Sequence, residues 1–247
     1  MKRTLSPALL PRLMLGLGGI GLVLQVWMYG TGIDDRGLLV NWHPAWILLV
    51  LLTAAAMVLL FLHCREDKAQ GTYHQNFPAS LAGFLGSIAE AFGIFLLSMT
   101  GLMDHPDTLN SVTGFLGVLC FPALVMAGYA RWKGKRPSFL LHALVCMFFA
   151  LRLFCQYRNW SSDPQLQNYC FQMLAGICLM MVAYQRAAFN LNIGSRKAYR
   201  FFSLAAVFFC CLSLMAPESK LFYLTAGVGA YTDLCVPVLP EQESPEA

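Results

Sequence analysis

Residues Ala45–Leu62 read AWILLVLLTAAAMVLLFL, a run of 18 positions without a charged side chain. A helix needs about 20 mostly apolar residues to cross roughly 30 Å of hydrocarbon at about 1.5 Å per residue. His43 and Pro44 precede the run, and the charged residues Arg65 and Glu66 follow shortly after it. The stretch therefore predicts a membrane-spanning helix.

The composition extends this interpretation to the whole chain. Of the 247 residues, 57% are hydrophobic and 12% are charged, about half of the roughly 25% charged residues typical of soluble domains. A compact soluble domain of this size still exposes a large surface, so it cannot hide that much apolar area from water. We therefore exclude a soluble enzyme, a disordered chain and a nucleic-acid-binding protein, and we expect the lipid bilayer to be the main partner.

Eight stretches of the chain match the length and apolar character of a membrane span. They are Leu13–Gly30, Ala45–Leu62, Phe77–Leu102, Leu109–Ala130, Ser138–Tyr157, Leu166–Gln185, Phe201–Ala216 and Leu221–Leu239. The seventh is short and lies close to the eighth, so seven spans are the alternative. The predicted fold class is an all-α integral membrane protein, a bundle of about eight transmembrane helices.

The distribution of basic residues predicts the orientation of this bundle. With the N-terminus inside, 13 of the 17 Lys and Arg residues fall in inner segments and 3 in outer ones, while Arg152 lies within a span. Basic loops stay cytoplasmic, so we expect a cytoplasmic N-terminus and a multi-pass protein of the plasma membrane. We interpret the inner basic residues, Arg131 and Arg186 among them, as solvated charges, and the net charge of +4 as contact with anionic lipid.

The chain is predicted to form one transmembrane domain, residues 1–240, followed by a short acidic tail, residues 241–247, that we expect to be disordered. A shift of 127 positions aligns Leu24–Trp27 with Leu151–Phe154 and Asn41-Trp42 with Asn168-Tyr169. This similarity favours two parallel halves of four spans, 1–130 and 131–240, with a site between them. Chance resemblance between apolar segments is the alternative.

Three charged residues lie inside the predicted spans: Glu90, Arg152 and Asp233. Charges in hydrocarbon cost about 2.5–3.5 kcal/mol each on insertion scales and are usually functional. Glu90 lies in the middle of a stripe of small residues at helical spacing, Gly83, Gly86, Ser87 and Gly93. Small residues let helices approach closely, so this stripe is predicted to face protein.

We expect five polar side chains to converge on one intramembrane site. They are Glu90, Arg152, Asp233, His142 and Gln156. In this hypothesis Arg152 neutralises one carboxylate and the other carboxylate holds a proton. The alternatives are that Glu90 is a protonated structural acid, that Arg152 extends to the outer headgroups, that Asp233 lies outside the bilayer, and that His142 is a satisfied bundle histidine.

The sequence predicts no metal site, cofactor or catalytic residue. The nine cysteines form no C-x-x-C pair, and phosphate-binding, zinc-protease, serine-hydrolase and dinucleotide motifs are missing. Cys155 and Cys170 flank an outer loop, so a disulfide between them stays open. Asn159 begins a glycosylation sequon on the same side.

These features favour a transporter of a small solute or ion, or a membrane subunit of one. Its partners would be the unknown solute and either further copies of the chain or a second membrane or ATPase subunit. One alternative is a non-catalytic sensor, assembly or accessory subunit. The other is a membrane-embedded enzyme that acts on lipid through Asp104, His105 and Asp107 near the outer surface.

Overall fold

The computed structural model of the chain describes residues 9–32, 43–65, 72–104, 107–161, 169–215 and 219–236. These residues form helices joined by short segments, with no strand among them. The helices are α1 (Leu9–Thr31), α2 (Pro44–Cys64), α3 (Tyr73–Asn76), α4 (Leu81–Asp104), α5 (Thr108–Trp132), α6 (Phe139–Trp160), α7 (Cys170–Asn190), α8 (Arg196–Leu212) and α9 (Lys220–Cys235). A 3₁₀ turn, Ser213–Met215, follows α8.

Seven of these helices are long and apolar enough to cross a membrane: α1, α2 and α4 to α8, with the turn extending α8. The prediction of an all-α, multi-pass membrane bundle is confirmed. The last predicted span corresponds to α9, which has 16 residues and is about 24 Å long. This helix packs between α4 and α8 as part of the bundle.

Prolines explain two helix ends that differ from the prediction. The third span was expected from Phe77, but Pro78 follows that residue, and α4 begins at Leu81 with the Ser80 hydroxyl accepting from the Gly83 amide. The eighth was expected to reach Leu239, but α9 ends at Cys235 and Val236 has an extended backbone. A residue before proline is disfavoured in the helical region, and Pro237 follows Val236 in the sequence.

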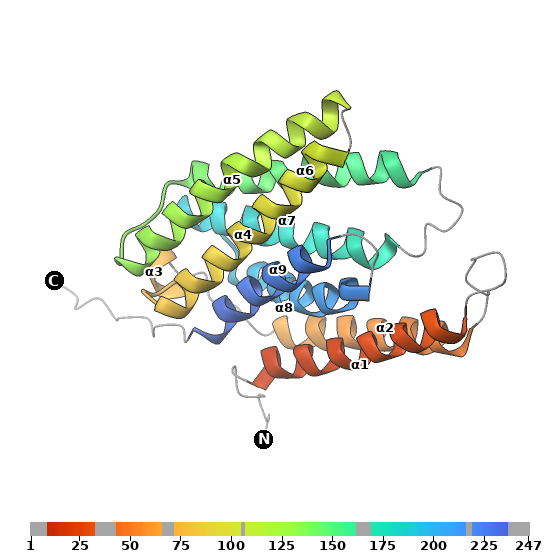
Figure 1. Cartoon of the computed structure of the whole chain (residues 1–247). Coiled ribbons are helices and arrows are strands. Elements are labelled where there is room, and N and C mark those ends of the chain that lie inside the picture. The colour runs from red at the N-terminus through yellow and green to blue at the C-terminus, as the bar shows by residue number, and fades with distance from the viewer. Residues whose placement is uncertain are drawn as a thin grey trace, which may run out of the picture.

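The helices lie roughly along one direction, and α8 is at the centre of the packing (Figure 1). It packs against α1, α2, α7 and α9. Eight successive residues, 203–210, are buried, so every side of this helix segment meets protein. The α1–α2 pair lies beside α8, away from α5 and α6 (Figure 1).

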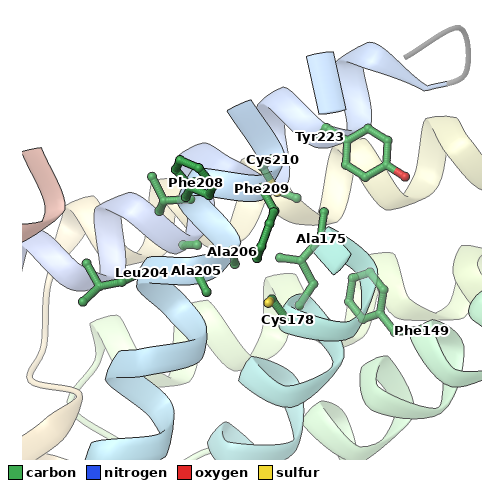
Figure 2. Packing of buried hydrophobic residues seen from close by; sticks show 14 of the residues in the cluster. Phe149, Ala175, Cys178, Leu204, Ala205, Ala206, Phe208, Phe209, Cys210 and Tyr223 are labelled. Atoms are coloured by element: carbon green, nitrogen blue, oxygen red, sulfur yellow. The ribbon is translucent and has the colours of Figure 1, made fainter. Parts of the chain in front are cut away.

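The apolar core runs through the bundle and includes residues of α1, α2 and α4 to α9. Figure 2 shows the part of it where α6, α7, α8 and α9 meet. Phe149 of α6, Phe209 of α8 and Tyr223 of α9 extend toward the small side chains of α7, including Ala175 and Cys178. Protein interiors are close-packed, so large rings opposite small residues hold the helices at fixed distances. This core fixes the positions of the polar groups on both sides of it.

The helices define two ends of the bundle. At the basic end α1, α4, α6 and α8 begin and α2, α5, α7 and α9 end, next to Arg65, Lys133, Arg136 and Arg196. At the opposite end the exposed pair of Asp107 and Arg158 joins the start of α5 to the end of α6.

The internal duplication stays a prediction. In two parallel halves α4 would correspond to α8, and α5 to α9. The helices α4 and α9 pack closely, whereas the corresponding α8 and α5 form no comparable pair.

The small-residue stripe of α4 faces protein, with Gly86 and Gly93 against α9 and Gly83 and Ser87 against α5. A Cβ atom added at Gly86 would overlap the Thr232 hydroxyl, and one added at Gly93 would overlap the Thr225 hydroxyl. Both threonines bond carbonyls of their own helix, Thr232 donating to Gly229 at 2.9 Å. The two antiparallel helices therefore approach at intervals of seven residues, and Glu90 lies between these two points.

Candidate functional site

Four charged side chains meet inside the basic half of the bundle. The carboxylates of Glu90 (α4) and Asp233 (α9) lie among the guanidiniums of Arg131 (α5) and Arg186 (α7), and each of the four residues is 3–8% exposed. We call these four residues the charge cluster. Its ordinary ionisation gives no net charge, which is the condition under which charged groups tolerate burial.

Asp233 is the centre of the charge cluster. Arg131 Nη1 donates to Asp233 Oδ1 at 2.6 Å, and Arg186 Nη2 donates to Oδ2 at 2.7 Å. The Tyr199 hydroxyl of α8 also donates to Oδ2, at 3.2 Å. Arg186 is shared, because its Nη1 donates to Glu90 Oε2 at 2.9 Å. Glu90 thus holds one ion pair, whereas Asp233 holds two.

Small residues and turns make room for the charge cluster. A Cβ atom at Gly83 would lie 2.9 Å from the guanidinium carbon of Arg131, so the glycine provides the space for this side chain. Arg131 also donates from Nε to the Pro78 carbonyl at 3.3 Å. The same proline that delays the start of α4 therefore supplies a hydrogen-bond acceptor to the cluster.

Aromatic rings separate the charge cluster from the basic end. Tyr73, Phe77, Phe189 and Tyr199 pack together, with the Phe77 ring centroid 5.0 Å from that of Tyr199 and 5.1 Å from that of Tyr73. We call these four residues the aromatic cap. The Arg131 guanidinium lies 5.3 Å from the Phe77 ring centroid. The cap thus covers the ion pairs with apolar surface, which strengthens them by excluding water.

A void of about 10 Å³ lies beside the charge cluster. Arg131, His142, Arg186 and Asp233 are among the residues that line it, and Arg131 Nη2 has no hydrogen-bond partner there. This volume is close to the smallest that holds one water. His142 is buried and lies 3.1 Å, Nδ1 to Nδ2, from Asn190, which agrees with the alternative of a satisfied bundle histidine.

A second and larger space lies near the opposite end. Its volume is about 580 Å³, and α4, α5, α6 and α9 line it. We call it the polar cavity. It reaches the exposed residues Thr100, Asn159 and Leu221 near the ends of their helices. Arg152 and Gln156, from one face of α6, are among its lining residues.

Apolar side chains separate the polar cavity from the charge cluster. Along α4, Glu90 precedes the first cavity residue, Leu96, by six positions, or about 9 Å. Ile94, Cys120, Phe149 and Ala226, one from each lining helix, are fully buried between the two levels. We call these four residues the apolar layer. The charge cluster and the polar cavity thus lie at different depths.

The structure therefore divides the predicted site. Glu90, Asp233 and His142 lie together, whereas Arg152 and Gln156 line the polar cavity. The prediction that Arg152 neutralises one of the two carboxylates is wrong, because Glu90 pairs with Arg186 and Asp233 pairs with Arg131 and Arg186. Arg152 instead lies 5.3 Å from the Phe222 ring centroid. Arg152 belongs to the opposite half of α6, too far along the helix to reach either carboxylate.

The interpretation of Arg131 and Arg186 as solvated loop charges is also wrong, since both are 5% exposed. Arg186 precedes the end of α7 by four residues and Arg131 lies in the last turn of α5. A signal was present in the sequence. Arg186 is followed by the apolar Ala187-Ala188-Phe189, and Arg131 follows the small residues Ala127 and Gly128 by about one turn.

The depth of Asp233 differs from the prediction as well. We expected a mid-membrane position similar to that of Glu90, but Asp233 precedes the last residue of α9 by two positions. It is nevertheless buried inside the bundle, and whether it lies inside the bilayer stays a prediction. Glu90 is the deeper carboxylate, about 13–14 Å from the start of α4.

Among the described residues, the other predicted candidates, the acidic loop and the cysteines, do not assemble a further site. Asp107 pairs with Arg158, and His105 lies outside the described residues. Cys155 and Cys170 are both free, and Cys155 Sγ lies 3.3 Å from the Thr113 hydroxyl. Within the described ranges, no three His, Cys, Asp or Glu side chains lie close enough to share a metal ion.

Tyr73 of the aromatic cap leads us to expect that the folded protein loses stability at alkaline pH. Burial raises the pKa of Tyr73 from 10.0 to about 12, and the Arg131 guanidinium opposes this to a smaller extent. The folded protein therefore holds the Tyr73 proton at pH values where the unfolded chain has lost it. This stabilisation is complete below pH 10 and is lost as the pH rises toward 12, by at most about 1.4 kcal/mol per pH unit. Tyr73→Phe is expected to lack this loss.

Thermal midpoints of wild-type and Tyr73→Phe protein, measured from about pH 8 to about pH 12, check this prediction. The difference between the two midpoints should shift in favour of the variant above pH 10. Parallel curves over the whole range would contradict it.

Comparison with known proteins adds no relative to this description: no family model, curated protein or solved structure matches the chain.

Proposed function

We propose that this membrane protein transports a small solute by exposing a polar site alternately to the two sides of the membrane. The observation that carries the proposal is the pairing of the polar cavity near one end with the charge cluster near the other. A cavity of about 580 Å³ is in the range of small-ligand sites, about 300–1,000 Å³. The charge cluster and aromatic cap close the path toward the basic end.

The chemistry of the charge cluster supports a role in opening and closing the basic end, in preference to a purely structural role. Replacing a buried ion pair with apolar residues is often neutral or stabilising, so a bundle that only needed closing has no need of charges there. Ion pairs differ from apolar packing because one proton or cation can neutralise the carboxylate and so remove the attraction. The charge cluster joins α4, α5, α7 and α9, three of which also line the polar cavity.

Glu90 is the member best suited to this switching role. It has a single ion pair, to Arg186, so binding of a proton removes one attraction between α4 and α7. Asp233 keeps its contacts with both guanidiniums in that state, and the buried charge left over is then one positive unit. This unbalanced state favours opening toward water at the basic end, where the cation is hydrated.

Flux through reconstituted protein tests the proposal. Liposomes with purified protein and an internal pH dye are challenged with a carboxylate, an ammonium compound, a sugar and potassium. At least one class is expected to change the internal pH faster than in protein-free liposomes, because protons move with the solute. Glu90→Gln, which keeps the side-chain shape, is expected to lower this flux by at least about tenfold, equivalent to about 1.4 kcal/mol.

Asp107→Asn is the matched control, because it removes a carboxylate from the exposed pair with Arg158. It is expected to keep wild-type flux. Fluorescence-detected chromatography in detergent shows whether Glu90→Gln is folded. Equal flux through folded Glu90→Gln and wild type would overturn the role of Glu90, and no flux for any class would overturn transport itself.

A further inference from the structure

The polar cavity contains a cation without a carboxylate partner among the described residues. Arg131, Arg158 and Arg186 each pair with a described acid. Arg152 is half-buried in the cavity wall, where it lies against the ring of Phe222 and interacts with the neutral Tyr223 side chain. None of the described lining residues is acidic. The wall therefore presents positive charge to whatever fills the cavity.

A buried hydrogen-bond donor lies next to this cation. Gln156 is one helical turn after Arg152, so both side chains lie on the same face of α6. Gln156 is 7% exposed, and its Nε2 has no hydrogen-bond partner. A buried amide donor without a partner is unfavourable, and an acceptor atom in the cavity would remove this cost. Arg152 and Gln156 are thus two convergent donors.

The rest of the cavity wall indicates the chemistry of a ligand whose anionic group would meet Arg152 and Gln156. Leu97, Phe148 and Phe222 give it apolar surface, and Asn110 and Thr100 lie closer to the opposite end. Guanidinium groups bind carboxylates through two parallel hydrogen bonds. An apolar portion a few carbon atoms long fits beside the rings within about 580 Å³.

We propose that the polar cavity is a binding site for a small organic anion, with Arg152 and Gln156 holding its carboxylate and Leu97, Phe148 and Phe222 contacting its apolar portion. The proposal rests on the proposed function in that this anion is the transported solute. A lipid phosphate offers similar acceptor chemistry. The apolar separation of the cavity from the charge cluster favours a solute that enters from the opposite end.

Thermal stabilisation of purified protein in a neutral detergent tests the site. The probes are sodium phenylacetate, its neutral analogue phenylacetamide, sodium hexanoate, sodium chloride at equal ionic strength, and dioctanoyl phosphatidylglycerol below its micelle concentration. Saturable stabilisation is expected with the two carboxylates and not with the amide or the salt. Arg152→Gln is expected to weaken carboxylate binding by at least about tenfold, and Gln156→Met by a smaller factor.

Arg158→Gln is the matched control, because it removes an arginine from the same helix outside the cavity. It is expected to bind as wild type does. Equal responses to phenylacetate and phenylacetamide, or unchanged binding by Arg152→Gln, would overturn the proposal. Stabilisation by the phospholipid alone would overturn the claim that the bound anion is a soluble solute. Carboxylate binding without flux would overturn transport and leave the anion site intact. Flux that Arg152→Gln does not alter would overturn the anion site and leave transport intact.

Discussion

Replacing Asp233 with asparagine is expected to lower the free energy of unfolding by about 3–5 kcal/mol and to abolish flux. Asp233 accepts hydrogen bonds from Arg131, Arg186 and Tyr199. The amide leaves two buried guanidiniums with one carboxylate, so one positive charge has no compensation. Removing one partner of a buried ion pair is far more costly than removing both.

Thermal or denaturing-detergent unfolding of the purified variants measures this effect. Asp107→Asn makes the same chemical change in an exposed pair and is expected to cost less than about 1 kcal/mol. The double variant Arg131→Gln/Asp233→Asn restores charge balance, so it should lose less stability than the sum of its single variants. Equal costs for Asp233→Asn and Asp107→Asn would contradict the central position of Asp233.

The comparison with Glu90 gives the expected order of effects within the charge cluster. Glu90→Gln removes one ion pair, and Arg186 keeps its contact with Asp233. Its cost is therefore expected to be smaller than that of Asp233→Asn. This order also separates the roles: Glu90 holds α4 to α7 through one ion pair, while Asp233 holds α5, α7 and α9 together.

The fold could be predicted from the sequence because hydrophobic runs in a membrane have few alternatives. Backbone groups without water must be satisfied inside a helix, so runs such as Ala45–Leu62 specify both secondary structure and environment. The helix ends were less certain, since Pro78 and Pro237 affect the residues before them and apolar residues continue past both. The position of Asp233 near the end of α9 follows from the second of these ends.

The candidate site could be predicted in part. The stripe around Glu90 correctly indicated a face against protein, because Gly86 and Gly93 have little other use in a helix interior. The arginine partners were missed for a physical reason: charge placement assigns Arg131 and Arg186 to the inner side, and it says nothing about whether they are hydrated. Both arginines satisfy the orientation rule and are buried.

The predicted pairing of Arg152 with a carboxylate failed because sequence spacing gives a depth on each helix and no relation between helices. Arg152 lies at the level of the polar cavity, beside Phe222 of α9, while Glu90 lies beside Gly229, seven residues further along α9. Seven residues correspond to about 10–11 Å. The antiparallel register of α4 and α9 decides these levels, and that register is visible only in the packed structure.

This register gives a second large effect at Gly86. Gly86→Leu is expected to lower the free energy of unfolding by about 3 kcal/mol, at the upper end of typical overpacking costs. A Cβ there overlaps the Thr232 hydroxyl and is already in van der Waals contact, at 3.4 Å, with the Gly229 Cα. The three further carbon atoms of leucine have no room beside this backbone, so α9 must move as a whole. Asp233 follows Thr232 directly, and this movement lengthens its bonds to Arg131 and Arg186.

Gly101→Leu on the same helix is the matched control for stability, because nothing lies within 4 Å of a Cβ atom at that position. Leucine is a better helix former than glycine by up to about 1 kcal/mol, so this variant should be neutral or slightly stabilised. Thr232→Ala added to Gly86→Leu should recover part of the loss, since it removes the side chain that is struck first, while the Gly229 backbone prevents full recovery. Equal effects of leucine at Gly86 and Gly101 would show that the close approach of α4 and α9 does not position Asp233 in the charge cluster.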